Sequence, residues 1–230
     1  MKNEQVKRIS QAVALFIFVG IVFLSALFWR TGEQETEQAE EKESAFLFSE
    51  VLGSCVRIQA EGHHGSGSIY EITEDEIIVV TNRHVLQYWG ENSYVTFSNG
   101  AVGDGEVMAV SDQADAGFLS VRTEFLTQEE LKGLHAVNKS ERELVRSDVL
   151  YMVDLASDVW HPEVYQGQVL EPLKFLDEFG MEMLYGESLF KPGMSGCGVF
   201  DEKGDYVGML TAGTEQNEIA AVPVEVIEFE

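Results

Sequence analysis

The chain has 230 residues, of which 45% are hydrophobic and 24% charged, with 21 glycines. This composition is too apolar for a disordered chain and too rich in glycine for a helical bundle. The formal net charge of −25 repels nucleic-acid phosphates and anionic lipid surfaces, which argues against a nucleic-acid-binding role. The length allows one medium-sized domain and an appendage.

The first element in chain order is an uncharged apolar run at residues 12–29. At about 1.5 Å per residue, it is just long enough as a helix to cross a hydrocarbon core of about 30 Å. Lys2, Lys7 and Arg8 precede it, and basic flanks stay in the cytoplasm. The sequence therefore predicts a cytoplasmic tail at 1–11, a transmembrane anchor at 12–29 and a domain beyond the membrane. A cleaved signal peptide is the alternative, but the run is long and lacks a small-x-small cleavage site.

Residues 30–44 are rich in glutamate and show no apolar periodicity, which is typical of an extended, self-repelling linker. Residues 1–44 contain five basic and seven acidic side chains, so a net charge of −23 belongs to residues 45–230. The acidity is therefore a property of the predicted folded domain.

From residue 46 onward, short β-rich runs alternate with turn residues. Their lengths and their content of β-branched and aromatic residues are those of strands. We expect twelve strands, at 54–60, 67–72, 76–82, 93–98, 105–111, 116–121, 148–154, 165–170, 181–186, 197–201, 206–211 and 219–224. Short helices are expected only after Arg83 and within 127–137, and a hairpin is expected at 202–205, where Gly204 is free to take positive φ. The pattern predicts an all-β domain of two packed antiparallel barrels or a large sandwich.

One of the five histidines stands out. His63 and His64 lie in a Gly/Ser-rich stretch read as a turn, His135 lies in the weaker helix, and His161 precedes Pro162 in a loop. His84 instead follows the strongly apolar run IIVVTN, where the chain must turn. An imidazole just beyond a strand end can be rigidly held and still reach a cleft.

A carboxylate and a hydroxyl complete the set of candidate groups. Asp115 stands at the start of an apolar strand, where a carboxylate drawn inward needs a partner such as a histidine N–H, whereas Asp112 reads as a turn residue. Ser195 lies in KPGMSGCGVF, where a Pro-Gly turn precedes it and glycines flank it closely. The serine alone does not distinguish a surface turn from a nucleophile.

These segments resemble the motifs of trypsin-like serine proteases. TNRHV is similar to their histidine motif, ADAGFLSV to their aspartate segment and KPGMSGCGVF to their Gly-x-Ser-Gly-Gly segment. GSGSIY and IAAVPVEVI extend the likeness to the bacterial HtrA-type branch over about residues 50 to 228. The order His–Asp–Ser differs from that of subtilisin-like and α/β-hydrolase enzymes. The resemblance implies two packed six-stranded antiparallel barrels, here in a protease domain at residues 45–230.

The resemblance also implies a role for each residue. Ser195 would attack the scissile carbonyl, His84 would transfer the proton, and Asp115 would orient the imidazole. The N–H groups of Gly193 and Ser195 would form the oxyanion hole. No metal or organic cofactor is implied.

The substrate pocket follows by analogy with the same enzymes. Leu189, Thr211, Ala212 and Gly213 would line it. No acid stands six residues before Ser195, so the resemblance implies a small or medium apolar side chain in the pocket rather than arginine or lysine.

Three features depart from the HtrA-type pattern. Lys191 replaces an asparagine, Cys197 replaces a glycine, and small residues, Ala116 and Gly117, follow Asp115. No PDZ domain follows in the sequence given. These departures leave the order of the nucleophile loop, regulation and oligomeric state open.

Cys55 and Cys197 have no metal-ligand spacing and are too few for a disulfide scaffold. A single bridge between them is possible, but two buried thiols are the expected state.

Two functional hypotheses result. The first is a membrane-anchored serine endopeptidase that acts on polypeptides outside the cytoplasm. The alternative is a catalytically silent trypsin-fold module that binds peptides or proteins at the cell surface.

Overall fold

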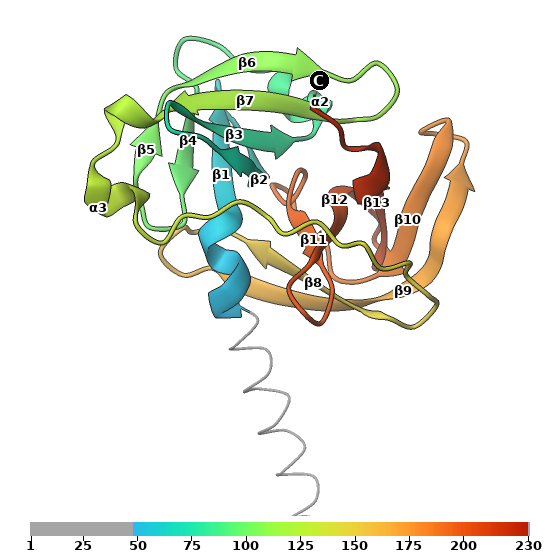
Figure 1. Cartoon of the computed structure of the whole chain (residues 1–230). Helices are drawn as coiled ribbons and strands as arrows, with labels where there is room; N and C mark the ends of the chain where they lie inside the picture. The colour runs from blue at the N-terminus through green and yellow to red at the C-terminus, as the bar shows by residue number, and fades with distance from the viewer. Residues whose placement is uncertain (1–47, 230) are drawn as a thin grey trace, which may run out of the picture. The chain divides into compact units, whose positions relative to one another are not determined.

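The computed structural model describes residues 48–229, so the predicted tail, anchor and linker at residues 1–44 lie outside the described residues. Within the described part, no helix has the length and apolar character needed to cross a membrane. The strands form two antiparallel assemblies in chain order (Figure 1).

The first assembly is a seven-stranded sheet in the order β5-β4-β1-β2-β3-β7-β6. The central strands β2, β3 and β7 contain runs of buried residues, whereas β6 is largely exposed. Their bounds are β1 (Cys55–Ala60), β2 (His63–Ile72), β3 (Glu76–Thr81), β4 (Tyr94–Phe97), β5 (Val102–Gly103), β6 (Gly105–Val110) and β7 (Gly117–Arg122).

The second assembly is a closed six-stranded barrel in the order β10-β13-β12-β11-β8-β9. It corresponds to the second barrel expected from the sequence. Its strands are β8 (Val149–Asp154), β9 (Glu163–Leu176), β10 (Met181–Glu187), β11 (Gly198–Phe200), β12 (Tyr206–Gly213) and β13 (Glu218–Pro223).

The prediction of two closed six-stranded barrels is therefore confirmed for the second half only. In the first half, β5 pairs with β4 and β6 pairs with β7, and no ladder joins β5 to β6. Both edge strands come from one segment, Val102 to Val110, which changes partner across the single residue Asp104. The sheet therefore ends in the two-residue strand β5 on one side and the six-residue strand β6 on the other, and it does not close into a ring.

Helical segments are few, as expected. α2 (Arg83–Leu86) is the single turn predicted after Arg83. α3 (Gln128–Leu131) begins with a capping box in which the Thr127 and Glu130 side chains bond each other's backbone N–H groups. Residues 48–51 are also helical, which the sequence analysis did not predict. Short 3₁₀ turns lie at η1 (Leu52–Ser54), η2 (Thr123–Phe125) and η3 (Val224–Val226).

Two local predictions need correction or extension. His63 and His64 were assigned to a turn, but β2 begins at His63, and the turn lies before it at Glu61 and Gly62, which have φ of 35° and 88°. The expected hairpin at 202–205 is present, and Gly204 has φ of 82°.

Each half has its own apolar core. Ile58, Ile77 and Leu119 lie fully buried in the first half, and Leu150, Met152 and Leu210 lie fully buried in the second. A further cluster includes Ile78 and Phe118 from the first half and Met209 and Val222 from the second. The two halves therefore share a hydrophobic seam, which is where burial stabilises their relative placement.

Two leucines test this view of the core. Leu119→Ala removes a side chain with no exposed surface and should lower the free energy of unfolding by about 2–5 kcal/mol. Leu173→Ala truncates a side chain that is 56% exposed and should change the free energy of unfolding by less than about 0.5 kcal/mol. Urea unfolding followed by tryptophan fluorescence measures both, and equal effects would contradict the assigned core.

Candidate active site

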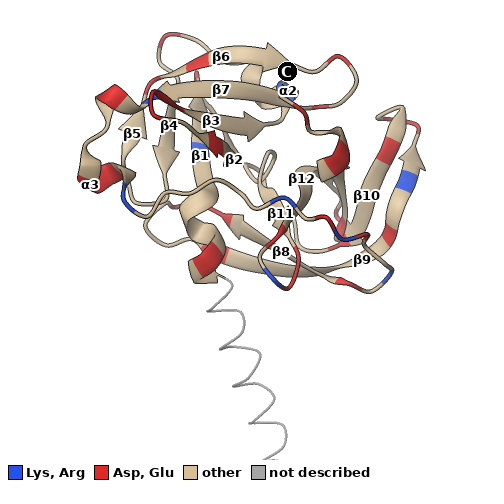
Figure 2. Ribbon diagram, viewed as in Figure 1, with Lys and Arg blue, Asp and Glu red and all other residues tan. Residues whose placement is uncertain are grey.

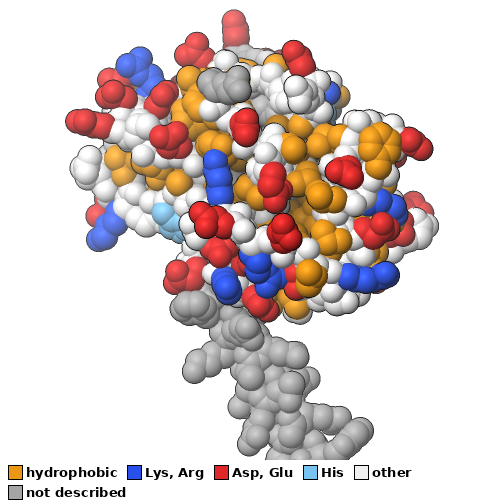
Figure 3. Space-filling model, turned by 45° about the vertical axis from the view of Figure 1, so that its right-hand side comes forward, with side chains coloured by type: hydrophobic (Ala, Val, Ile, Leu, Met, Phe, Trp, Pro, Cys, Tyr) orange, Lys and Arg blue, Asp and Glu red, His pale blue; other side chains and the backbone are white. Residues whose placement is uncertain are grey.

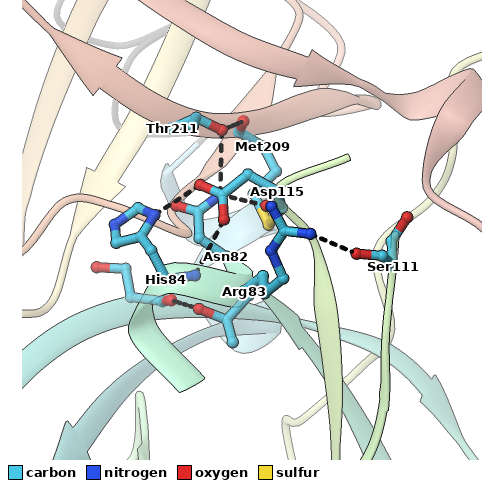
Figure 4. A network of polar contacts seen from close by, with 9 residues as sticks. Asn82, Arg83, His84, Ser111, Asp115, Met209 and Thr211 are labelled. Carbon is cyan, nitrogen blue, oxygen red and sulfur yellow. Dashed lines mark hydrogen bonds and ion pairs between the residues drawn. The ribbon is translucent and has the colours of Figure 1, made fainter. Parts of the chain in front are cut away.

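His84 is held by Asp115 through two hydrogen bonds (Figure 4). The Nδ1 atom of His84 lies 2.6 Å from Oδ2 of Asp115, and the backbone N–H of His84 donates to Oδ1 at 3.0 Å. Because an ionised carboxylate only accepts, Nδ1 carries the proton and Nε2 is left to accept. The sequence prediction that this aspartate partners this histidine is met by the geometry.

Asp115 is fixed through its backbone as well as its side chain. Asn82, the residue before α2, donates from Nδ2 to the Asp115 carbonyl at 2.9 Å and to Oγ1 of Thr211 at 3.0 Å. Asn82 thus ties the loop of Asp115 to β12 of the barrel. Thr211, predicted as a pocket residue, is 5% exposed and belongs to this network.

The small residues after Asp115 fit a tight site. Ala116 is buried, and a Cβ on Gly117 would lie 2.6 Å from a methyl carbon of Leu86. Larger aliphatic side chains would not fit here, so the small residues do not leave Asp115 loosely supported.

The environment favours the ionised form of Asp115. Burial opposes ionisation, but the hydrogen bonds from His84 and the nearby His84 and Arg83 charges outweigh it, and the pKa of Asp115 lies below its ordinary value. The Asp115 side chain is 15% exposed and that of His84 is 42% exposed. The pair therefore has a sheltered acid and an imidazole that solvent or a ligand can reach.

Ser195 lies in a compact turn between β10 and β11. Gly193 and Gly196 have φ of 98° and 88°, a region that side chains disfavour. The N–H of Met194 donates to the Lys191 carbonyl at 3.1 Å, and that of Gly196 donates to the Leu210 carbonyl at 2.8 Å. Among residues 48–229, the N–H groups of Gly193 and Ser195 have no acceptor. Both donors are free for a ligand.

Ser66 on β2 binds this turn from the other half of the domain. Its N–H donates to the Ser195 carbonyl at 2.8 Å, and its hydroxyl donates to the Gly193 carbonyl at 3.0 Å. The Ser66 carbonyl in turn accepts from the Thr81 hydroxyl at 2.7 Å. A Cβ on Gly196 would lie 2.1 Å from the Ser66 carbonyl oxygen, so glycine is required by contact as well as by φ.

The hydroxyl of Ser195 makes no hydrogen bond to His84 in the described part of the chain. The structure thus contains the His84–Asp115 pair and the Ser195 turn without the bond that would join them. Such bonds are often long in the absence of substrate.

Two residues that the sequence analysis did not select flank Gly193. A Cβ on Gly193 would lie 2.6 Å from Cδ2 of His64 and 3.0 Å from Cβ of Ala156. Asp154 supports Ala156, because its buried carboxylate accepts the N–H of Ala156 at 2.8 Å and the Ser157 hydroxyl at 2.8 Å. Placing His64 on a strand rather than in a turn would have brought it into consideration.

The unusual Lys191 anchors the turn to β9. Its Nζ lies 2.6 Å from Glu163 Oε2 and 5.0 Å from the ring centre of Tyr165. The hydrogen bond to Glu163 raises the pKa of Lys191, and the same bond lowers the pKa of Glu163. This surface pair supports a defined position for the turn.

Both cysteines are free and buried, as expected. The thiol of Cys197 donates to the Val153 carbonyl at 3.2 Å, and that of Cys55 donates to the Val51 carbonyl at 3.3 Å. Burial raises the pKa of Cys55 to about 12 and that of Cys197 well above its ordinary value. Neither thiol is a reactive thiolate at neutral pH.

The remaining residues of the predicted pocket lie near a phenylalanine. Leu189 is 55% exposed, while the ring of Phe190 lies against Gly213, 2.3 Å from where a Cβ would stand. Ala212 is half-buried beside Gly213 on β12. Phe190 is therefore a further candidate for shaping a pocket here.

No cluster of three or more metal-ligating side chains occurs within residues 48–229. The arrangement is that of an imidazole with an orienting carboxylate, near a serine turn with two free N–H donors.

Comparison with known proteins adds a family and a fold. The family described as trypsin-like peptidase domain matches residues 53–209. The solved structure of Deg5 is 21% identical, with a TM-score of 0.66 over 81% of this chain and 90% of that chain. Rv3671c from M. tuberculosis H37Rv, solved as a serine-to-alanine mutant in an inactive form, is 13% identical, with a TM-score of 0.62 over 78% and 85%. A search of curated proteins found no match. The resemblance to trypsin-like serine proteases is confirmed by the family, and the two solved structures share the fold.

The lowered pKa of Asp115 has a consequence for stability. An acid whose pKa is lower in the folded state stabilises the fold above its unfolded-state pKa, about 3.9, and loses that contribution as the pH falls through the folded-state value. Asp115→Asn should therefore lower the thermal unfolding midpoint at pH 7, and the difference from wild type should shrink below about pH 4. The control is Asp112→Asn, because Asp112 is exposed and its carboxylate makes no hydrogen bond within residues 48–229. A constant difference for Asp115→Asn down to the most acid pH measured would contradict the assignment.

Proposed function

Because this chain belongs to the trypsin-like peptidase family, we propose that it is a serine endopeptidase with His84, Asp115 and Ser195 as its catalytic residues. One observation carries the proposal: the paired bonds of Asp115 to the side chain and backbone of His84. This pairing sets both the tautomer and the direction of the imidazole, which a general base requires.

The mechanism follows from these positions. Nε2 of His84 takes the proton from the Ser195 hydroxyl as its oxygen attacks the carbonyl carbon of the substrate. The proton then passes to the leaving amine, the C–N bond breaks, and an acyl-enzyme remains. A water molecule, activated by His84 in the same way, then attacks the acyl-enzyme and releases the carboxylic acid product and the free Ser195 hydroxyl. Asp115 keeps its charge throughout and stabilises the imidazolium.

The free N–H groups of Gly193 and Ser195 would bind the oxyanion that forms in each step. Their lack of acceptors within residues 48–229 means that no protein bond must break first. The Ser66 bonds to the carbonyls of the same two residues hold those peptide units in place. One such donor is typically worth about 3 kcal/mol to the transition state.

The substrate pocket that the resemblance predicts beside Gly213 would favour a small side chain in the substrate. Phe190 lies against Gly213 and occupies space that a large side chain would need. This supports the prediction of a small or medium apolar preference, with Phe190 as the residue that limits size.

We also propose that the peptidase is anchored by residues 12–29 and acts outside the cytoplasm. This rests on the apolar run and its basic flank.

The missing Ser195–His84 bond keeps the silent binding module as the second candidate. A fluorophosphonate probe distinguishes the two, because it reacts only with an activated serine. The full-length chain should be labelled, and Ser195→Ala and His84→Ala should each reduce labelling at least about a hundredfold. Ser98→Ala and His161→Ala serve as controls, since neither residue makes a hydrogen bond to His84, Asp115 or Ser195 within residues 48–229, and both should label as the wild type does. Failure of the wild type to label, with peptide binding retained, would favour the silent module.

A second prediction concerns the pocket. Phe190→Ala should shift preference toward larger apolar side chains at the cleaved bond, by roughly tenfold in kcat/KM, because it vacates space beside Gly213. Phe175→Ala, which truncates a ring that is 58% exposed on β9, is the matched control. Cleavage of a peptide library followed by mass spectrometry measures the preference. Unchanged selectivity in Phe190→Ala would remove Phe190 from the pocket.

A further inference from the structure

A large open groove lies between the two halves of the domain, next to the candidate active site. It encloses about 1050 Å³ and is lined by the end of β6, by β10 and by η3, among other segments. Buried apolar side chains on its wall include Phe118, Leu184 and Val207, and more exposed ones include Leu173 and Val226. The groove can therefore contact apolar groups along its length.

The charged groups on this groove are almost all acidic. Five carboxylates line it, from Asp112, Glu143, Glu182, Glu225 and Glu228. All five side chains belong to exposed residues, and none forms an ion pair with another residue in the described part. The single cation, Arg142, is already paired with Asp148 and Glu202.

The figures agree with this distribution. Figure 2 shows acidic positions on β10 and on the short dark-red turn of Figure 1 that follows β13. On the face turned forward in Figure 3, apolar side chains gather between carboxylates. An apolar surface rimmed by unpaired carboxylates complements a ligand that is both basic and apolar.

The groove is continuous with the space beside the catalytic pair. A second cavity of about 510 Å³ is lined by both His84 and Asp115. It shares Asp112, Gln113, Ala114 and Met181 with the groove. A chain that passes His84 can therefore run on into the groove without leaving the surface.

We propose that this groove is a second binding site for the polypeptide substrate, which takes an extended segment of alternating basic and apolar residues away from the cleaved bond. The inference rests on the proposed peptidase function for the identity of the ligand. The segment places its basic side chains on the rim carboxylates and its apolar side chains on the groove wall. It adds affinity and selects basic substrates, while the pocket at Gly213 selects by size.

Binding can be measured without catalysis. A fluorescent peptide that alternates lysine with leucine is titrated against the full-length Ser195→Ala chain by anisotropy. The triple variant Glu182→Gln, Glu225→Gln and Glu228→Gln removes three rim charges and keeps the side-chain shapes. Three exposed ion pairs together account for roughly tenfold in affinity, so binding should weaken by about that factor and become less dependent on salt.

The matched control removes three exposed carboxylates elsewhere, with Glu71→Gln, Glu91→Gln and Glu215→Gln. It changes the net charge equally, so it should bind the peptide as the parent does. Equal weakening in both triple variants would show that only the overall charge matters and would overturn the proposal, as would the absence of binding to the parent. Sedimentation without peptide gives a further outcome: a dimer that only the rim variant dissociates would place a second copy of the chain on the groove and overturn the proposal.

Catalytic assays separate this inference from the proposed function. The three rim substitutions are placed in the chain that keeps Ser195, and two peptides are compared, with basic residues before or after the cleaved bond. For at least one of these peptides, kcat/KM should fall about tenfold relative to wild type. Fluorophosphonate labelling should stay unchanged. If Ser195 is labelled but the rim substitutions do not change kcat/KM, the peptidase function is supported and the proposed binding role of the groove is overturned. If the peptide binds in the groove but Ser195 is not labelled, the binding role of the groove is supported and the peptidase function is overturned.

Discussion

The site depends on the contacts that Ser66 makes between the two halves of the domain. Its N–H and hydroxyl bind the carbonyls of Ser195 and Gly193, and its own carbonyl accepts the Thr81 hydroxyl. Thr81 ends β3, one residue before Asn82 and three before His84. The pairing of β2 with β3 therefore sets the position of the serine turn relative to the imidazole. Because buried hydrogen bonds are costly to leave unmade, a shift of either strand would break several at once.

Met194, together with Lys191 and Cys197, which depart from the HtrA-type pattern, supports the same turn. The Met194 side chain is fully buried, and its sulfur accepts the N–H of Lys191 at 3.3 Å. Lys191 reaches Glu163 on β9, and Cys197 binds the Val153 carbonyl on β8. The turn is thus tied to β2, β8 and β9, which pre-organises its two free N–H donors and avoids reorganisation during a reaction. These substitutions are compatible with an ordered loop, which the sequence alone left open.

Local patterns were sufficient to predict most strands and the turn after Arg83, whereas the pairing of His84 with Asp115 was implied by the resemblance to trypsin-like proteases. Such patterns work because alternating burial and turn residues are encoded within a few positions. The open first sheet was not predictable, since it depends on the change of partner at Asp104. His64 was missed because it was assigned to a turn, and Ala156 because it reaches Gly193 from a distant part of the sequence, where Asp154 supports it. The predicted anchor at 12–29 stays a prediction.

The carboxylates of this acidic domain serve two different purposes. Asp115 must stay ionised beside His84, although the domain already carries a large excess of carboxylates. The ionisation of Asp115 depends mainly on its hydrogen bonds to His84 in a site sheltered from solvent. The exposed carboxylates elsewhere affect it little, because salt screens exposed charges over about 10 Å at 0.1 M. The rim carboxylates of the groove lie in water and act on ligands instead. Burial thus separates the carboxylate that orients the imidazole from those that attract a basic chain, and both can operate within one acidic domain.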